Sequence, residues 1–216
     1  KIALLLCKFT TITSKFSNNM PDFWIFFKVG LNHVLSLNAY DHLLFIGVLS
    51  APFVFKDWKR LLVLVSFFTL GHSIALFLSV FKIVTAQVAI VELLILGTIL
   101  VSALFNLFTT SKPSHKGGFT FISGITLLFG IIHGLGFSNY FNTLLPGNDS
   151  DKLAPLVEFA LGIETAQIVV VLVVLMLSFI AQTLLRFNKR DFTLILSSFA
   201  IGVVTPLIID NPFWKK

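Results

Sequence analysis

The stretch LLVLVSFFTLGHSIALFLSVF, residues 61–81, decides the fold class, because it contains no Asp, Glu, Lys or Arg from end to end. A helix that crosses a bilayer needs about 20 predominantly apolar residues. Comparable runs follow along the chain at 86–108, 119–141, 155–185 and 192–209. These runs predict an integral membrane protein, and the histidine inside the first of them, His72, raises the question of function.

Two shorter apolar segments precede these runs, at 22–37 and 39–55. We expect the second to be a sixth span, and the first to be a seventh span or a re-entrant segment. The predicted fold is all-α: a polytopic membrane helical bundle of six to seven transmembrane helices, with a short or re-entrant first helix. In domain terms, we expect one bundle over 22–210, an N-terminal segment over 1–21 and a C-terminal tail over 211–216.

The composition agrees with this class, since 56% of residues are hydrophobic and only 12% are charged, against about 25% charged in soluble domains. The single cysteine, Cys7, excludes an internal disulfide framework and a thiolate cluster. The net charge of +6 is spread over the loops between spans, so it predicts no nucleic-acid partner. A metal ion and the lipid bilayer are the expected partners, and the sequence leaves protein partners unknown.

Basic residues concentrate in three of the loops between the predicted spans. They are Lys56, Lys59, Arg60, Lys112, Lys116, Arg186, Lys189 and Arg190. The positive-inside rule places these loops in the cytoplasm. We therefore predict a multi-pass protein of the bacterial inner (cytoplasmic) membrane, and expect an N-terminus on the cytoplasmic side if segment 22–37 spans.

Seven ionisable side chains fall in or at the edge of the predicted spans. They are His33, Asp41, His42, His72, Glu92, His133 and Glu164. Each costs about 2.5 to 3.5 kcal/mol in a membrane helix unless it finds a partner. At about 1.5 Å per helical residue, all seven lie in the outer half of the membrane or at its midplane, with the first three near the outer ends of two separate helices. We predict one site that faces the periplasmic or extracellular side.

Each of these groups also has a structural explanation. Asp41 can cap a helix, Glu92 can sit in a wet vestibule, and His72 can bond to a neighbouring helix. The glycines at 130, 134 and 136 favour close approach of another backbone whether or not His133 is functional. His115, in a polar loop, is expected to be solvated. The shared depth of the seven groups favours the site.

The order of the groups along the chain also suggests an internal pseudo-repeat, in which three successive hairpins each place a histidine on one helix and an acid on the next. The expected pairs are His33 with Asp41, His72 with Glu92, and His133 with Glu164.

Imidazoles and carboxylates that converge in a dry place form an environment for a divalent transition metal. Nitrogen and oxygen donors suit Ni, Co, Zn, Cu(II) or Fe, and the absence of a nearby cysteine disfavours Cu(I). An acid outside the immediate ligand set can orient an imidazole through its second nitrogen.

Five segments stand in this order along the chain: GLNHVLSLNAYDHLLF, FFTLGHSIAL, IVELLILG, FGIIHGLGFSNYF and LGIETAQ. Together they resemble the HupE/UreJ family, membrane proteins associated with nickel or cobalt uptake for hydrogenase and urease. The resemblance covers about residues 26 to 210 and implies a metal motif at His33, Asp41 and His42, continued by the later histidines and acids. VLSLNAY separates His33 from Asp41, so a break near 37–40 permits the two to meet, and a continuous helix places them together less readily.

Three functions remain open from the sequence. The first is a permease for a Ni/Co-type ion, with no catalytic residue; it needs an inner route, for which the sequence offers only scattered hydroxyls and one amide: Thr98, Ser102, Ser123, Thr126, Ser178 and Gln182. The second is an intramembrane metal-dependent hydrolase with Glu92 or Glu164 as general base. The third is a haem-binding membrane protein with two axial histidines. The residue pattern favours a transporter over an enzyme.

Overall fold

The computed structural model describes residues 22–36, 40–85, 87–109, 118–145 and 152–215, and within these ranges every regular element is a helix. The elements are α2 (Asp22–Leu35), α3 (Tyr40–Ser50), η1 (Phe55–Asp57), α4 (Trp58–Val80), α5 (Val88–Thr109), α6 (Gly118–Leu144), α7 (Leu153–Thr183), α8 (Lys189–Ile209) and η3 (Pro212–Lys215). The predicted N-terminal segment and His115 lie outside the described residues. The C-terminal tail contains the short 3₁₀ helix η3.

Helices α4 to α8 are each long and apolar enough to cross a membrane. Large apolar side chains cover their outward faces, among them Leu70, Val101, Phe108, Met176 and Phe199. An apolar exterior of this kind is stable only against lipid, because it would present a large hydrophobic surface to water. The chain is therefore a multi-pass membrane protein, as the sequence predicts.

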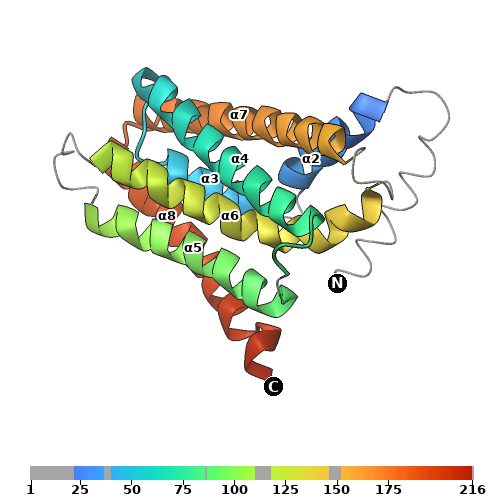
Figure 1. The fold of residues 1–216 in the computed structure, drawn as a ribbon. Coiled ribbons are helices and arrows are strands. Elements are labelled where there is room, and N and C mark those ends of the chain that lie inside the picture. Colours follow the sequence, from blue (N-terminus) through green and yellow to red (C-terminus); the bar gives the residue numbers. More distant parts are fainter. Residues whose placement is uncertain (1–21, 37–39, 86, 110–117, 146–151, 216) are drawn as a thin grey trace.

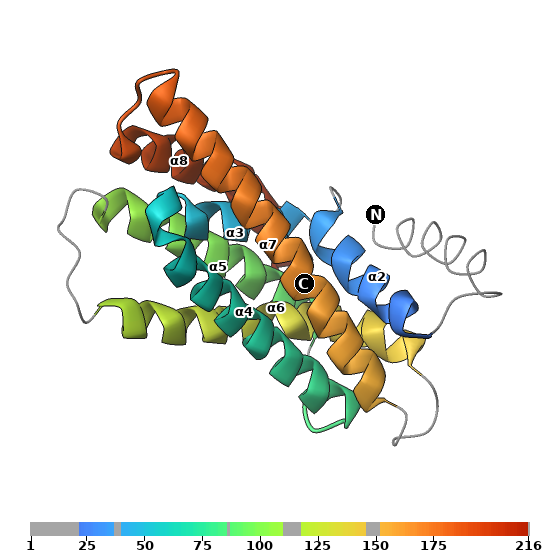
Figure 2. The same cartoon turned by 90° about the horizontal axis from the view of Figure 1, so that it is seen from above.

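Helices α2 and α3 are too short to cross separately, and they follow one another in the same direction through the bundle (Figure 1; Figure 2). Their lengths are about 21 Å and 16 Å at the rise of an α-helix, against a hydrocarbon core of about 30 Å. Ring contacts confirm the direction, since Phe26 of α2 lies 6.2 Å from Phe141, whereas Phe45 of α3 lies 5.9 Å from Phe129, further back along α6. The two segments form one interrupted crossing, which agrees with the predicted bundle of six to seven helices whose first helix is short.

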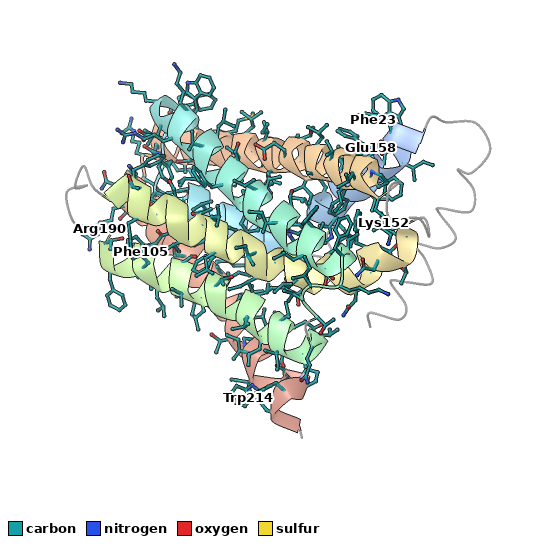
Figure 3. All side chains as sticks on the ribbon, viewed as in Figure 1. Phe23, Phe105, Lys152, Glu158, Arg190 and Trp214 are labelled. Atoms are coloured by element: carbon teal, nitrogen blue, oxygen red, sulfur yellow. The ribbon has the colours of Figure 1, made fainter. Side chains whose placement is uncertain are left out.

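This arrangement changes the side on which the bundle begins. Phe23, at the start of α2, lies with Lys152 at one end of the molecule, and Arg190 lies at the other (Figure 3). Together with α4 to α8, the interrupted crossing gives six crossings. Helix α2 therefore starts opposite the basic turns, not beside them as two full spans would require.

The far end of α3 stops inside the bundle because side chains from other helices satisfy its terminal carbonyls. Asn106 of α5 donates to the carbonyl of Val48 (2.8 Å), and Thr193 of α8 donates to that of Ala51 (3.0 Å). The last carbonyls of any helix lack partners within it, and lipid offers none. These bonds also bring the α3–α4 turn beside the start of α8. We call this side of the molecule, with Lys56, Lys59, Arg60, Arg186, Lys189 and Arg190, the basic end.

Glycines let two pairs of helices cross at backbone contact. Helix α2 packs on α7, and α4 packs on α6, more extensively than any other described pair. The glycines are Gly30 and Gly162 in the first pair, and Gly71, Gly130 and Gly134 in the second; a Cβ at any of them would meet the backbone of the facing helix. The predicted packing role is confirmed for two of the three glycines near His133, while Gly136 faces the Ile95 side chain.

Candidate metal centre

Four histidines from four different helices meet in the core. The ring centroid of His33 (α2) lies 4.6 Å from that of His42 (α3) and 5.6 Å from that of His72 (α4). The His42 ring lies 5.8 Å from His72 and 5.2 Å from His133 of α6. The side chains of His42, His72 and His133 are at most 2% exposed. The structure thus gathers all four membrane histidines that the sequence singles out.

The cluster lies where the α2–α3 crossing is interrupted. His33 is in the last turn of α2, and His42 is in the first turn of α3. His72 and His133 lie in the middle third of α4 and α6. The expectation that His33 and His42 stand near the outer ends of two helices is therefore wrong, because those helix ends meet inside the bundle.

Hydrogen bonds fix the proton on two of the rings. The Nδ1 of His133 lies 2.9 Å from the carbonyl oxygen of Phe129, which can only accept. The Nδ1 of His42 lies 3.2 Å from Oδ1 of Asp41. Both Nδ1 atoms therefore carry hydrogen in the neutral ring, and Nε2 holds a lone pair.

Five of the other ring nitrogens are buried without hydrogen-bond partners among the described residues. They are Nε2 of His33, His42 and His133, and both nitrogens of His72. An unsatisfied buried polar atom costs about 1 to 3 kcal/mol, so five in one place are costly unless something else binds them. The described residues offer no preformed set of three or more His, Cys, Asp or Glu donors for a metal. What the structure shows is a cluster of rings with centroids 4.6 to 5.8 Å apart.

Asp41 serves the cluster through its neighbour. Its Oδ1 accepts the backbone N–H of His42 at 2.9 Å as well as the ring contact, and the side chain is 26% exposed. Tyr40 precedes Asp41 in α3, and the bond to the N–H of the next residue is not an N-cap bond, in which the side chain accepts from two or three residues further on. The contact with the ring is of the kind by which a carboxylate orients an imidazole.

The side chain of Glu164 bonds to α4 and not to the histidine cluster. Its two carboxylate oxygens accept the hydroxyls of Ser66 (2.6 Å) and Thr69, both on α4. Neither ring nitrogen of His72 has a hydrogen-bond partner among the described residues, so Glu164 does not orient that ring. The predicted site residue is thus part of a separate, satisfied contact between α4 and α7.

Glu92 lies in the second turn of α5 and is partly exposed. It is close enough to Asp41 for the two charges to interact. Glu92 is therefore a neighbour of the cluster's acid and not of a particular histidine.

The proposed pseudo-repeat does not describe these pairings. Asp41 bonds to His42, and Glu164 bonds to the helix that carries His72, not to the one that carries His133. The first of the three hairpins is itself absent, because α2 and α3 form one crossing.

Comparison with known proteins identifies the family of this chain. A family model described as HupE / UreJ protein matches residues 10–209. The chain belongs to the HupE/UreJ family. Searches of curated proteins and of solved structures give no match. Membership in the HupE/UreJ family supports a membrane protein of nickel/cobalt-transporter type in general terms.

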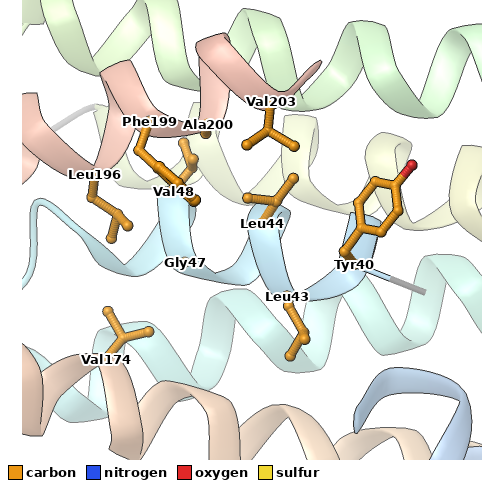
Figure 4. A pocket seen from close by; sticks show the side chains of 10 residues that line it. All are labelled: Tyr40, Leu43, Leu44, Gly47, Val48, Val174, Leu196, Phe199, Ala200 and Val203. Carbon is orange, nitrogen blue, oxygen red and sulfur yellow. The ribbon is translucent and has the colours of Figure 1, made fainter. Parts of the chain in front are cut away.

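An apolar pocket of about 320 Å³ lies beside the cluster in this HupE/UreJ protein, between α3, α7 and α8 (Figure 4). Tyr40, next to Asp41, lines one end of it, and aliphatic side chains and Phe199 line the rest. A second, shallower groove runs along α4 past Ser66. No histidine lines either pocket, so neither is the outward-facing metal cavity expected from the sequence.

Several buried polar residues of this HupE/UreJ protein escaped the sequence analysis. Ser50, Asn106 and Ser197 gather near the end of α3, and Asn106 reaches Ser197 at 3.3 Å. Single polar residues in apolar runs carry a weak signal, because nothing in the sequence says which helices will face one another. By contrast, the hydroxyls of Thr98 and Ser102, offered as an inner route, bond to their own helix backbone.

Proposed function

We propose that this HupE/UreJ protein is a permease for a divalent transition-metal ion of the Ni/Co type, which it binds as substrate through the four clustered imidazoles. One observation carries the proposal: imidazoles from four helices meet in the core with ring nitrogens that have no partner among the described residues. Neutral imidazole nitrogen is a preferred ligand of nickel, zinc, copper and iron. The cargo itself would satisfy these atoms.

Binding replaces water around the ion with imidazole lone pairs. Nδ1 of His42 and of His133 is already committed to Asp41 and to a backbone carbonyl, so Nε2 is the atom that faces the ion. Asp41 increases the basicity of its imidazole and adds a negative charge near the cation. Rotation of His33 and His72, which have no partner at Nε2, completes the ligand set.

The interrupted crossing supports movement of the ion rather than permanent storage. His33 and His42 belong to two short helices, so they can separate without bending a continuous one. Discontinuous helices at the binding site are a recurring device in transporters, because they let one part of the bundle move against another. Glu92 and Glu164 have an electrostatic role in this proposal, not one as direct ligands.

We also propose that the protein lies in the bacterial inner membrane with the basic end in the cytoplasm, in accordance with the positive-inside rule. The α6–α7 side then faces the periplasm. The ion would enter from that side and leave toward the basic end.

The two alternatives need features that the described residues do not supply. A hydrolase needs an opening to its metal-bound water, and no histidine lines the two pockets. A haem protein needs a flat slot between its axial histidines, whereas phenylalanine rings pack against the imidazoles, as at Phe137 3.9 Å from His33 and Phe68 5.0 Å from His133.

The test is elemental analysis of protein purified in detergent, as wild type, as the His72→Ala/His133→Ala double variant and as His115→Ala, the control that removes a histidine from a predicted loop. We expect near-stoichiometric metal in the wild type and the control, and loss in the double variant. Equal and negligible metal in all three would refute the site.

Uptake of radioactive nickel or cobalt into sealed vesicles then separates transport from binding. We expect the wild type to accumulate ion and the double variant to stay at background. A metal-loaded wild type that moves no ion would contradict a permease and favour an enzyme or a sensor.

A further inference from the structure

Phenylalanine rings close the histidine cluster on the side away from the basic end. Phe137 of α6 and Phe159 of α7 stack in parallel with centroids 5.1 Å apart, and Phe141 lies 4.7 Å from Phe159. The Phe137 ring touches His33 at 3.9 Å. We call Phe137, Phe141 and Phe159 the distal layer.

A second layer closes the cluster on the side toward the basic end. Phe45 of α3 and Phe68 of α4 stack at 4.8 Å with 25° between their planes, and Phe129 of α6 lies 5.9 Å from Phe45. His133 lies 5.2 Å from Phe45 and 5.0 Å from Phe68. We call Phe45, Phe68 and Phe129 the proximal layer.

The order of the layers follows from α6, which passes Phe129, His133 and Phe137 in turn. The imidazoles therefore lie between two aromatic layers. Polar groups resume beyond the proximal layer, where the Oγ of Ser50 is buried without a partner among the described residues and Asn106 bonds to Ser197. A cation on the way to the basic end thus meets nitrogen donors, then an apolar barrier, then oxygen donors.

We propose that the two stacked pairs, Phe137–Phe159 and Phe45–Phe68, are the gates of the transport route and that the structure is its occluded state. The inference rests on the proposed transport function. Each pair joins two different helices, so a tilt of one helix parts the rings. The contact between two aromatic rings is weak enough to break during each cycle, while a closed stack excludes water from the ion.

Ordinary core packing is the competing explanation, and it makes a different prediction. A packing residue changed to alanine loosens the bundle without regard to side. A gate changed to alanine exposes the cluster from one side only. Accessibility of a reporter thiol from each side therefore separates the two explanations without any measurement of metal.

The experiment places the thiol by His133→Cys in a Cys7→Ser background and applies a charged, membrane-impermeant thiol reagent to right-side-out and inside-out vesicles. We expect slow labelling from both sides. Adding Phe45→Ala should speed labelling from the basic end alone by up to about tenfold, and adding Phe159→Ala should do so from the opposite side alone. Phe81→Ala, which breaks the Phe77–Phe81 contact (4.7 Å) outside both layers, should change neither rate.

The gate proposal would be refuted if labelling became equally faster from both sides, became faster from the opposite side to that expected, or did not change in a folded variant. Where an alanine variant does not purify as a folded protein, Phe45→Leu and Phe159→Leu keep most of the volume and should give the same sidedness with a smaller change. Sided labelling, combined with an otherwise wild-type protein that retains no metal in the elemental analysis, would leave the gates in place and refute the proposed metal cargo.

Discussion

The histidine cluster and the Glu164 contact differ in how their polar atoms are satisfied. In the cluster, five ring nitrogens are buried without partners in the described chain. At Glu164, both carboxylate oxygens accept hydroxyls from α4. A buried polar group that has its hydrogen bonds within the protein needs no ligand to account for it. A cluster of buried polar atoms without hydrogen bonds indicates that something else binds them. Depth in the membrane alone does not separate the two cases.

We expect the largest difference in nickel affinity between the His72→Ala and Glu164→Gln variants. The first removes the ring with two unpaired nitrogens and should lower nickel affinity by more than the roughly 100-fold that loss of an outer partner can cost. The second should leave affinity within a few-fold of wild type. Titration calorimetry of the purified proteins measures both nickel affinities. Similar losses of affinity in the two variants would mean that the histidine cluster and the Glu164 contact do not differ in metal binding.

Asp41→Asn should have the next largest effect. An amide can still contact the His42 ring but carries no charge, so we expect nickel affinity to fall by about 10- to 100-fold. Asp191→Asn, which changes an acid at the start of α8, is the matched control and should bind as wild type does. An unchanged affinity in Asp41→Asn would mean that the carboxylate charge does not act on the His42 ring.

Glu164→Ala should affect stability instead of binding. It breaks two bonds to α4, each worth about 0.6 kcal/mol on average in membrane proteins. A loss of this size lowers the melting temperature by about 2 to 4 °C per kcal/mol in a chain of this length. Thermal unfolding in detergent measures it, and a combined Ser66→Ala/Thr69→Val variant should show the same loss, not an additive one, when joined to Glu164→Ala.

Gln167→Leu should give the smallest change, and in the opposite direction. Gln167 is fully buried on α7, and neither Oε1 nor Nε2 has a partner among the described residues. An apolar side chain of similar size removes that cost and should raise stability by about 1 kcal/mol or less. A fall in melting temperature would show that the amide is bonded in the protein as purified and belongs with Glu164.

Sequence reasoning succeeded where the signal is local. Long apolar runs identified α4 to α8, and the VLSLNAY interval required a break between His33 and Asp41, which falls between Leu35 and Tyr40. It failed where the outcome depends on which helices meet. Whether segment 22–37 crosses by itself stayed open in the sequence, and contacts along α6 show that α2 and α3 share one crossing. Asn106 and Thr193, which support the end of α3, are inconspicuous in their own helices.

The sequence by itself determined that this chain is a helical membrane protein and that four of its five histidines lie in apolar runs, because hydrophobicity and charge are properties of each segment alone. Only the tertiary structure decided that these four imidazoles cluster, that Glu164 bonds elsewhere, and that phenylalanine rings pack on both sides of the cluster. The reason is geometric: a side chain's partners lie on other helices, and the glycine crossings that set the helix pairs act across the whole chain.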